Sequence, residues 1–271
     1  MGFPTSVTVV PASLHLLPAR GMSAYIDKVQ PNVECMKNIS DMPYADDMKF
    51  SSNCRLCPRL ANFLDEVRAA QPDYYARPVP SFGSENAHFM IVGLAPGMHG
   101  ANRTGRPFTG DFAGNLLYST LHKFGFSSSA KPLDAEGNPN PQLTLHHCRI
   151  TNAVRCLPPQ NKPELSEVKQ CNVYLKNELR ELPHGAAVLA LGTVAHAAVL
   201  RTLDLRTLGM NDPHFKFSHG AQHTLPNGLR LYDSYHCSRY NTQTKRLSEA
   251  MFHAVFRDIC TYLNDVNRVK E

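Results

Sequence analysis

Short apolar runs that alternate with helical patterns constrain the fold of this chain more than any other feature. Four strand-like runs stand at 88–92, 149–154, 186–191 and 231–235, and the first and third are apolar almost throughout. A strand that is apolar on both sides belongs to a sheet with both faces covered. Alternation of strands with long helical crossovers further indicates parallel pairing. We therefore expect an α/β fold, a three-layer αβα sandwich around a short central parallel sheet.

Helical patterns fill the segments between these runs. Apolar residues repeat at helical spacing in 114–125, in 163–182 after a proline at the helix start, in 192–203 and in 246–266. The turn-rich segments 127–142 and 210–227 are expected to form loops or hairpins. The sequence has no internal repeat and no second domain boundary, so residues 26–271 are expected to fold as one domain.

The first 25 residues differ from the rest of the chain, because they contain no acidic residue and only one arginine. Two prolines and a histidine interrupt their apolar run, which argues against a secretory signal. We expect residues 1–25 to be a disordered extension, with an organellar leader as the alternative. Without export, the eight cysteines lie in a reducing compartment, and the expected location is the cytoplasm. No run approaches the ~18 apolar residues of a membrane helix, so no membrane partner is expected.

Four of the cysteines have the spacing of a candidate metal centre. Cys54 and Cys57 form a CxxC pair, and Cys156 and Cys171 follow with fourteen residues between them. Four thiolates of this kind can hold zinc or an iron–sulfur cluster. The spacing alone leaves free thiols and a redox pair as alternatives. A metal here would tie the N-terminal segment to the sheet, and closing a loop of roughly a hundred residues stabilises by about 4–5 kcal/mol by analogy with a disulfide.

Polar clusters follow three of the predicted strands directly. They are GLAPG…GD at 93–111, NAVRC at 152–156 and HCSRYN at 236–241. In an open parallel sheet, ligands bind at the carboxyl ends of the strands. The fold is therefore expected to bring the three clusters to one edge, where they form a site.

The same motifs carry a family resemblance. GLAPG…HGANRTGRPFTGD, YYARPVPSFG at 74–83, NAVRCLPPQNKP at 152–163 and YHCSRYNTQTKRLS at 235–248 resemble the uracil-DNA glycosylase superfamily, above all its family 5, the type B iron–sulfur enzymes. The resemblance covers roughly residues 50–265. It departs from the family pattern at Gly97, where alanine is frequent, and at Cys237, where proline is frequent. The first change is expected to widen the pocket and the second to loosen the turn that aims His236.

This resemblance implies a function, a cofactor and partners. The protein would flip uracil out of DNA and hydrolyse its N-glycosidic bond, which leaves an abasic site in base excision repair. Other deaminated bases are further candidate substrates. The resemblance implies a monomer with a [4Fe–4S] cluster, and it implies the cluster ligands Cys54, Cys57, Cys156 and Cys171.

The chemistry of the residues, read together with the resemblance, suggests roles within the site. Asp111, which is the only carboxylate in residues 86–120, would position the attacking water or face the sugar cation. A helix N-cap is the alternative role for Asp111, and the two roles are compatible. Phe108 would stack on the flipped base, Asn152 would read a pyrimidine edge, and His236 would donate a hydrogen bond to the base oxygen where negative charge grows. The remaining substrate-binding positions are Gly93, Leu94 and Ala95.

Contacts to DNA are expected around the same edge. The net charge of +5 and the isoelectric point near 8.8 suit a polyanionic partner, although such an excess also serves solubility. Ser238 and Arg239 resemble the family's minor-groove loop. Phosphate contacts would come from Arg103, Arg106 and His99, and they would make binding salt-dependent.

Three other functions compete with uracil excision. A dinucleotide-dependent dehydrogenase requires G-x-G-x-x-G, whereas this chain has G-x-x-x-G-x-x-G. A non-catalytic lesion-binding protein on the same fold would keep Phe108 and Asn152 without hydrolysis. A glycosylase acting mainly on hypoxanthine, xanthine or damaged pyrimidines is the third alternative.

Overall fold

The computed structural model describes residues 49–203, 205 and 212–268. The N-terminal extension expected at 1–25 and the first part of the expected domain lie outside the described residues. The expectation of one domain over 26–271 therefore stays a prediction.

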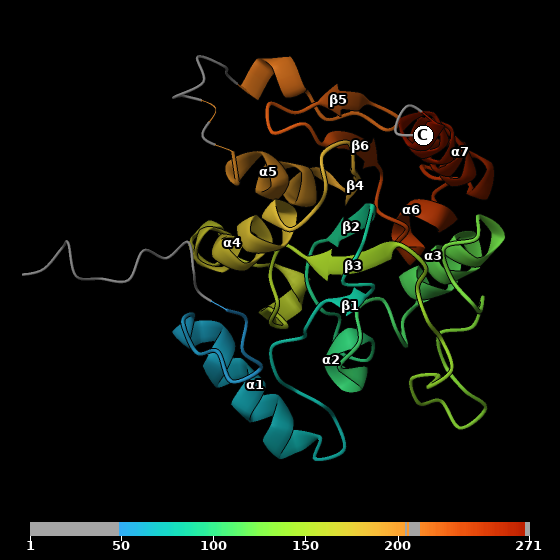
Figure 1. The fold of residues 1–271 in the computed structure, drawn as a ribbon. Coiled ribbons are helices and arrows are strands. Elements are labelled where there is room, and N and C mark those ends of the chain that lie inside the picture. Colours follow the sequence, from blue (N-terminus) through green and yellow to red (C-terminus); the bar gives the residue numbers. More distant parts are fainter. Residues whose placement is uncertain (1–48, 204, 206–211, 269–271) are drawn as a thin grey trace, which may run out of the picture. The chain divides into compact units, whose positions relative to one another are not determined.

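One mixed sheet of six strands forms the centre of the described chain (Figure 1). The strand order is β1-β3-β2-β4-β6-β5. The four inner strands pair in parallel and the two edge strands pair antiparallel to their neighbours. The bounds are β1 (Phe82–Gly83), β2 (Phe89–Gly93), β3 (Cys148–Asn152), β4 (Ala187–Leu191), β5 (Gln222–Thr224) and β6 (Arg230–Ser234). The predicted α/β class and parallel centre are confirmed, and the antiparallel edges are an addition.

Seven α-helices and two short 3₁₀ helices connect these strands in the part of the chain that is described. Their bounds are α1 (Pro58–Ala70), α2 (Ala101–Thr104), α3 (Phe112–Lys123), η3 (Pro159–Asn161), α4 (Leu165–Arg180), α5 (Thr193–Arg201), η4 (Asp212–Phe215), α6 (Arg239–Gln243) and α7 (Glu249–Arg268). The helix predicted to start at Pro163 begins two residues later, because Glu164 and Glu167 form a capping box there. None of the described helices is both long and apolar enough to cross a membrane.

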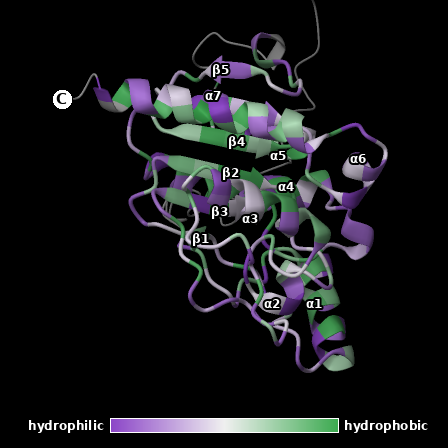
Figure 2. Cartoon of the chain, turned by 90° about the vertical axis from the view of Figure 1, so that its right-hand side faces the viewer, coloured by the Kyte–Doolittle hydropathy of each residue, from purple (hydrophilic) through white to green (hydrophobic). Residues whose placement is uncertain are grey.

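Each face of the sheet has its own apolar core. Along β2, Met90 and Val92 pack into the core beneath α1, α4 and α5, whereas Phe89 and Ile91 pack into the core beneath α3 and α7. Figure 1 shows α4 and α5 on one side of the sheet and α3 and α7 on the other, and Figure 2 shows hydrophobic residues concentrated in β2 and β4. Alternate residues of a strand point to opposite faces, so a continuously apolar strand requires these two layers of helices.

Candidate active site

The polar clusters follow the carboxyl ends of β2, β3 and β6. Gly93 ends β2 and pairs in register with Asn152, which ends β3. Ser234 ends β6, and His236 lies two residues beyond it. The fold thus brings the first residues of the three clusters to one edge of the sheet, as the strand order of a parallel sheet requires.

Gly93, Phe108 and Asn152 are in close contact. A methyl group at Gly93 would lie 2.3 Å from Asn152 Oδ1 and 2.6 Å from Phe108 Cζ, so only glycine fits between them. Asn152 is 3% exposed, and its Oδ1 is buried without a hydrogen-bond partner. An unsatisfied buried acceptor costs about 1–3 kcal/mol. A ligand that donates to this oxygen would remove that cost.

Phe108 has an unusual backbone conformation. Its φ is 53°, in the left-handed region that non-glycine residues seldom adopt. Its carbonyl oxygen lies so close to Gly114 that a methyl group there would be 1.7 Å away. Such strain persists only where the surroundings impose it, and it concentrates at functional sites. The sequence did not reveal this conformation.

His236 stacks on Phe108, with ring centroids 5.8 Å apart and 26° between the ring planes. The side-chain amide of Asn241 donates to the carbonyl oxygen of His236 over 2.8 Å and fixes the turn that carries it. Burial lowers the pKa of His236 to about 4. The ring is therefore neutral near pH 7 and carries one N–H, which is sufficient to donate one hydrogen bond.

Asp111 caps helix α3 and also lines the glycine-rich loop. Its Oδ1 accepts a hydrogen bond from the Gly114 amide over 2.9 Å. A methyl group at Gly100 would lie 2.6 Å from its Oδ2, so this oxygen packs against the loop. Burial raises the pKa of Asp111 above its ordinary value, and the hydrogen bonds from Gly114 and Ala113 offset part of the rise. The capping role is thus present, and the role in catalysis stays a prediction.

The two arginines of the first motif hold a neighbouring loop. Arg103 donates from both Nη atoms to the carbonyl oxygen of Gly137 over 3.1 Å. Arg106 donates to the carbonyl oxygen of Asn140 over 2.8 Å and stacks on Phe82, with Cζ 4.4 Å from the ring centroid. These contacts attach the segment predicted as a loop or hairpin at 127–142 to the motif. The phosphate contacts expected of both arginines stay predictions.

The other expected DNA contacts lie around α2 and α6. Ser238 caps α6 by accepting from the Asn241 amide over 3.3 Å, and the exposed Arg239 lies over the ring of Phe112. His99 Nδ1 is 2.8 Å from the hydroxyl of Tyr74. Sequence reasoning did not single out Tyr74, although the quoted YYARP motif contains it.

The four candidate metal-ligating cysteines line one cavity. They come from three places: Cys54 and Cys57 precede α1, Cys156 follows β3, and Cys171 lies within α4. Tyr174 donates its hydroxyl to Cys54 Sγ over 3.3 Å, and the backbone amide of Arg155 lies 3.4 Å from Cys171 Sγ. Burial raises the pKa of the Cys171 thiol to about 11 and also raises those of Cys57 and Cys156.

Arg155 is a residue of this centre that sequence reasoning missed. Its side chain is 2% exposed, pairs with the carboxylate of Glu178 and lies over the ring of Phe50. Its Nε and Nη1 are buried without hydrogen-bond partners. A buried cation with two unused donors beside four thiols is an environment that favours an anionic group.

These features together define a class of protein. The sheet gathers an aromatic ring, a buried amide with an unused acceptor and a neutral imidazole at its carboxyl edge, and this set suits a planar, hydrogen-bonding ring. The chain is thus an α/β protein whose site at the strand ends has the shape and the hydrogen-bonding groups to accommodate a nucleobase-like ring.

Comparison with known proteins identifies the family. The family model described as "Uracil DNA glycosylase superfamily" matches residues 80–260, and the chain belongs to that superfamily. A type-5 uracil-DNA glycosylase of Thermus thermophilus is 46% identical over 210 residues, which are 76% of this chain and 91% of that protein. The type-5 enzyme of Mycobacterium leprae is 42% identical, covering 76% and 90%. The type-5 enzyme of Pyrobaculum aerophilum is 38% identical, covering 79% and 91%.

Proposed function

We propose that this protein excises uracil from DNA by hydrolysing the N-glycosidic bond, which leaves an abasic site for base excision repair. One observation carries the proposal: Phe108, Asn152 and His236 meet at one edge of the sheet in a chain of this superfamily. A base inside a duplex cannot reach such a site, so the nucleotide must be extruded first.

Base recognition follows from the contacts of Phe108 and Asn152. The face of Phe108 supplies a stacking surface for the flipped ring. The unpartnered Oδ1 of Asn152 accepts from the ring N–H that uracil carries and cytosine lacks, while the amide N–H₂ donates to the adjacent carbonyl. With cytosine in the site this buried acceptor would stay unpaired, so the site should discriminate strongly against cytosine.

The bond-breaking step requires charge stabilisation at both ends. Negative charge grows on the leaving base, and the neutral His236 donates a hydrogen bond to its oxygen. Positive charge grows on the sugar, as in other glycoside cleavages. The ionised carboxylate of Asp111 stabilises that charge and orients the attacking water through the oxygen that does not cap α3.

The four cysteines are proposed to hold a [4Fe–4S] cluster. Among the described residues, the only set of three or more ligand atoms lying within 4.8 Å of one another excludes these sulfurs. A single zinc ion would hold tetrahedral sulfurs about 3.8 Å apart. A spacing wider than this favours the larger cluster, and the unused donors of Arg155 suit the net negative charge of a metal group held by four thiolates. Its contribution when bound is structural, because it links the segment before α1 to β3 and α4.

A panel of DNA substrates tests this function. Oligonucleotides containing uracil, hypoxanthine or xanthine are incubated with wild type and Asp111→Asn, and abasic sites are detected by alkaline strand cleavage. We expect cleavage at uracil by wild type and strongly reduced cleavage by the variant. Binding without cleavage of any base would favour the lesion-binding alternative, and preferred cleavage at the purines would favour the third alternative.

We also propose that the protein acts as a monomer in the DNA-containing cytoplasm of a bacterium or archaeon. The three relatives compared above come from such organisms. Light scattering of the purified protein at micromolar concentration tests the oligomeric state, because a dimer would have twice the measured mass of a monomer. Fractionation of the source cells tests the location.

A further inference from the structure

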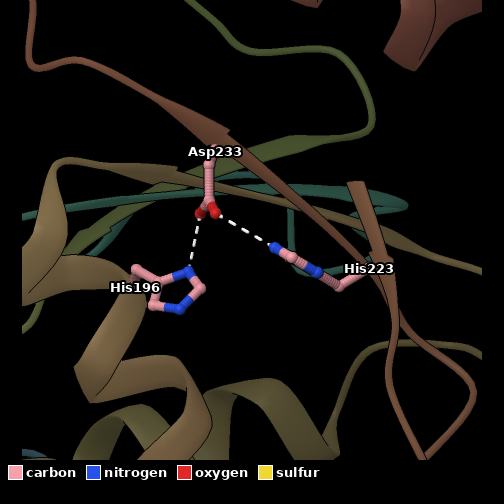
Figure 3. Close-up of side chains that lie close together, drawn as sticks. All are labelled: His196, His223 and Asp233. Carbon is pink, nitrogen blue, oxygen red and sulfur yellow. Dashed lines mark hydrogen bonds and ion pairs between the residues drawn. The ribbon is translucent and has the colours of Figure 1, made fainter. Parts of the chain in front are cut away.

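A buried group of two histidines and one aspartate lies apart from the residues used above. His196 comes from α5, His223 from β5 and Asp233 from β6 (Figure 3). In the described chain, this is the only set of three or more His, Cys, Asp or Glu residues with ligand atoms within 4.8 Å of one another. Figure 3 shows both rings directed at the carboxylate of Asp233. Neither base recognition nor the cysteine centre involves these side chains.

Three side-chain polar contacts hold the group among the residues that the structure describes. His196 Nδ1 is 2.8 Å from Asp233 Oδ1, and His223 Nε2 is 3.2 Å from Asp233 Oδ2. His196 Nε2 is 2.7 Å from the carbonyl oxygen of Phe215. Asp233 is fully buried, whereas the side chain of His223 is 11% exposed and leaves an approach from solvent.

The number of protons in this arrangement is constrained. A carbonyl oxygen only accepts, so Nε2 of His196 must carry a proton. In a neutral ring, Nδ1 then has a lone pair, and it faces the carboxylate oxygen of Asp233, which is a second acceptor. Two acceptors 2.8 Å apart require a proton between them, and a metal ion can replace that proton if the two atoms move apart.

We propose that His196, His223 and Asp233 form a binding site for a divalent transition metal ion, with zinc as the best match. Two imidazole nitrogens and one carboxylate are a common zinc ligand set, with water in the fourth position. Ligating histidines usually donate their other N–H to a carbonyl or carboxylate, as His196 does to Phe215. The rings of Phe217 and Phe215 lie 5.6 Å from His196 and 5.9 Å from His223, centroid to centroid, and give the site an apolar surround.

Metal binding exchanges a proton for the ion. The proton on His196 Nδ1 leaves, and the proton of His223 moves from Nε2 to Nδ1, so one proton is released for each ion bound. Ligands about 2.0–2.1 Å from zinc lie about 3.4 Å apart, so His196 and Asp233 must separate by about 0.6 Å. The ion would fasten α5 and β5 to β6, whose end leads after two residues to His236.

Cobalt binding to the cluster-loaded protein tests the site. The protein is treated with a chelator that leaves the thiolates with their iron, and Co²⁺ is added. We expect one Co²⁺ per chain with visible d–d bands but without the near-ultraviolet charge-transfer band of cobalt thiolates. Zinc should displace the cobalt. Calorimetry in two buffers of different ionisation enthalpy should show release of about one proton per ion.

Variants separate this site from other metal binding. His223→Gln removes the most accessible ligand, and His146→Gln changes an exposed histidine outside the group. We expect more than about a hundredfold weaker Co²⁺ binding in His223→Gln and wild-type binding in His146→Gln, since loss of a direct ligand exceeds the 10–100-fold cost of losing an outer contact. Wild type without Co²⁺ bands, or equal binding by both variants, would refute the site and leave a protonated hydrogen-bonded group. Uracil excision, measured separately, reports on the proposed function and not on this site.

Discussion

Two glycines of the first motif provide a matched pair of substitutions beside Asp111. A methyl group at Gly100 would lie 2.6 Å from Asp111 Oδ2 and 2.9 Å from its Cβ and Cγ. A methyl group at Gly97 would meet only Oδ2, at an ordinary 3.5 Å. Because Cβ is attached to the backbone, rotating the carboxylate alone cannot relieve the contact made by Gly100→Ala. The two variants add the same atom three residues apart with different consequences.

The structure gives the size of the expected effect. Restoring a contact of about 3.5 Å moves the carboxylate of Asp111 by about 0.9 Å. A displacement of about 1 Å at a reacting group costs about a hundredfold in rate. Gly100→Ala should therefore lose about a hundredfold in single-turnover excision, whereas Gly97→Ala should stay within a few-fold of wild type. Weakening of the α3 cap should also lower the melting temperature of Gly100→Ala by about 2–4 °C, since the cap is worth about 1 kcal/mol.

The assay is single-turnover cleavage of a uracil-containing oligonucleotide with enzyme in excess, read by alkaline strand scission. Thermal melting and iron content of each variant establish that the proteins are folded and loaded. If Gly100→Ala excised uracil at the wild-type rate, the position of Asp111 would not matter and its role in catalysis would be refuted. If Gly97→Ala lost as much activity as Gly100→Ala, the steric argument would be wrong.

Three further predictions follow from the same contacts. Asp111→Asn removes the charge but keeps the oxygen that caps α3, so turnover should fall about 10²–10⁴-fold with little change in melting temperature. Because burial raises the pKa of Asp111, excision by wild type should decline as the pH falls through that raised value, and the variant should lack this decline. Burial lowers the folded-state pKa of His236 to about 4, so the unfolded chain binds more protons than the folded chain below about pH 6.5. The free energy of unfolding, measured by urea titration, should therefore decrease as the pH falls from about 6.5 to about 4, and it should decrease less in His236→Gln. Cys171→Ser should lose bound iron and up to about 4–5 kcal/mol of unfolding free energy, measured by iron assay and urea denaturation.

The inner sheet could be predicted from the sequence, because strands that are buried on both faces appear there as short, continuously apolar runs. A continuously apolar run such as that of β2 requires two helical layers, and the order of strands and helices then determines which motifs share an edge. The edge strands β1 and β5 were not predicted, because they contain two and three residues and are partly exposed, so no periodicity marks them. Both edge strands form by pairing with β3 and β6, and the local sequence of a two- or three-residue strand carries no signal for such pairing.

The site shows the same division between what is local and what depends on the fold. The meeting of Phe108, Asn152 and His236 follows from topology and was predicted. The left-handed backbone of Phe108 depends on the close approach of Gly114, which only the folded chain reveals. Likewise, the burial of Arg155 and the grouping of His196 with Asp233 join side chains from different elements, and no sequence spacing records them.

The short segment after β3 links the cysteine centre to the active site. Asn152 and Phe108 both pack against Gly93 in the site, and Cys156 lines the cavity of the cysteine centre four residues after Asn152. Between them, the amides of Ala153 and Val154 donate to the carbonyl oxygens of Gly93 and Leu94 over 2.9 and 3.0 Å. A cluster bound to Cys156 would therefore restrain the same segment that holds Asn152, the side chain proposed to read the base. A structural cofactor would in this way contribute to recognition of the base without contacting it, because it would hold Asn152 beside Gly93 and Phe108.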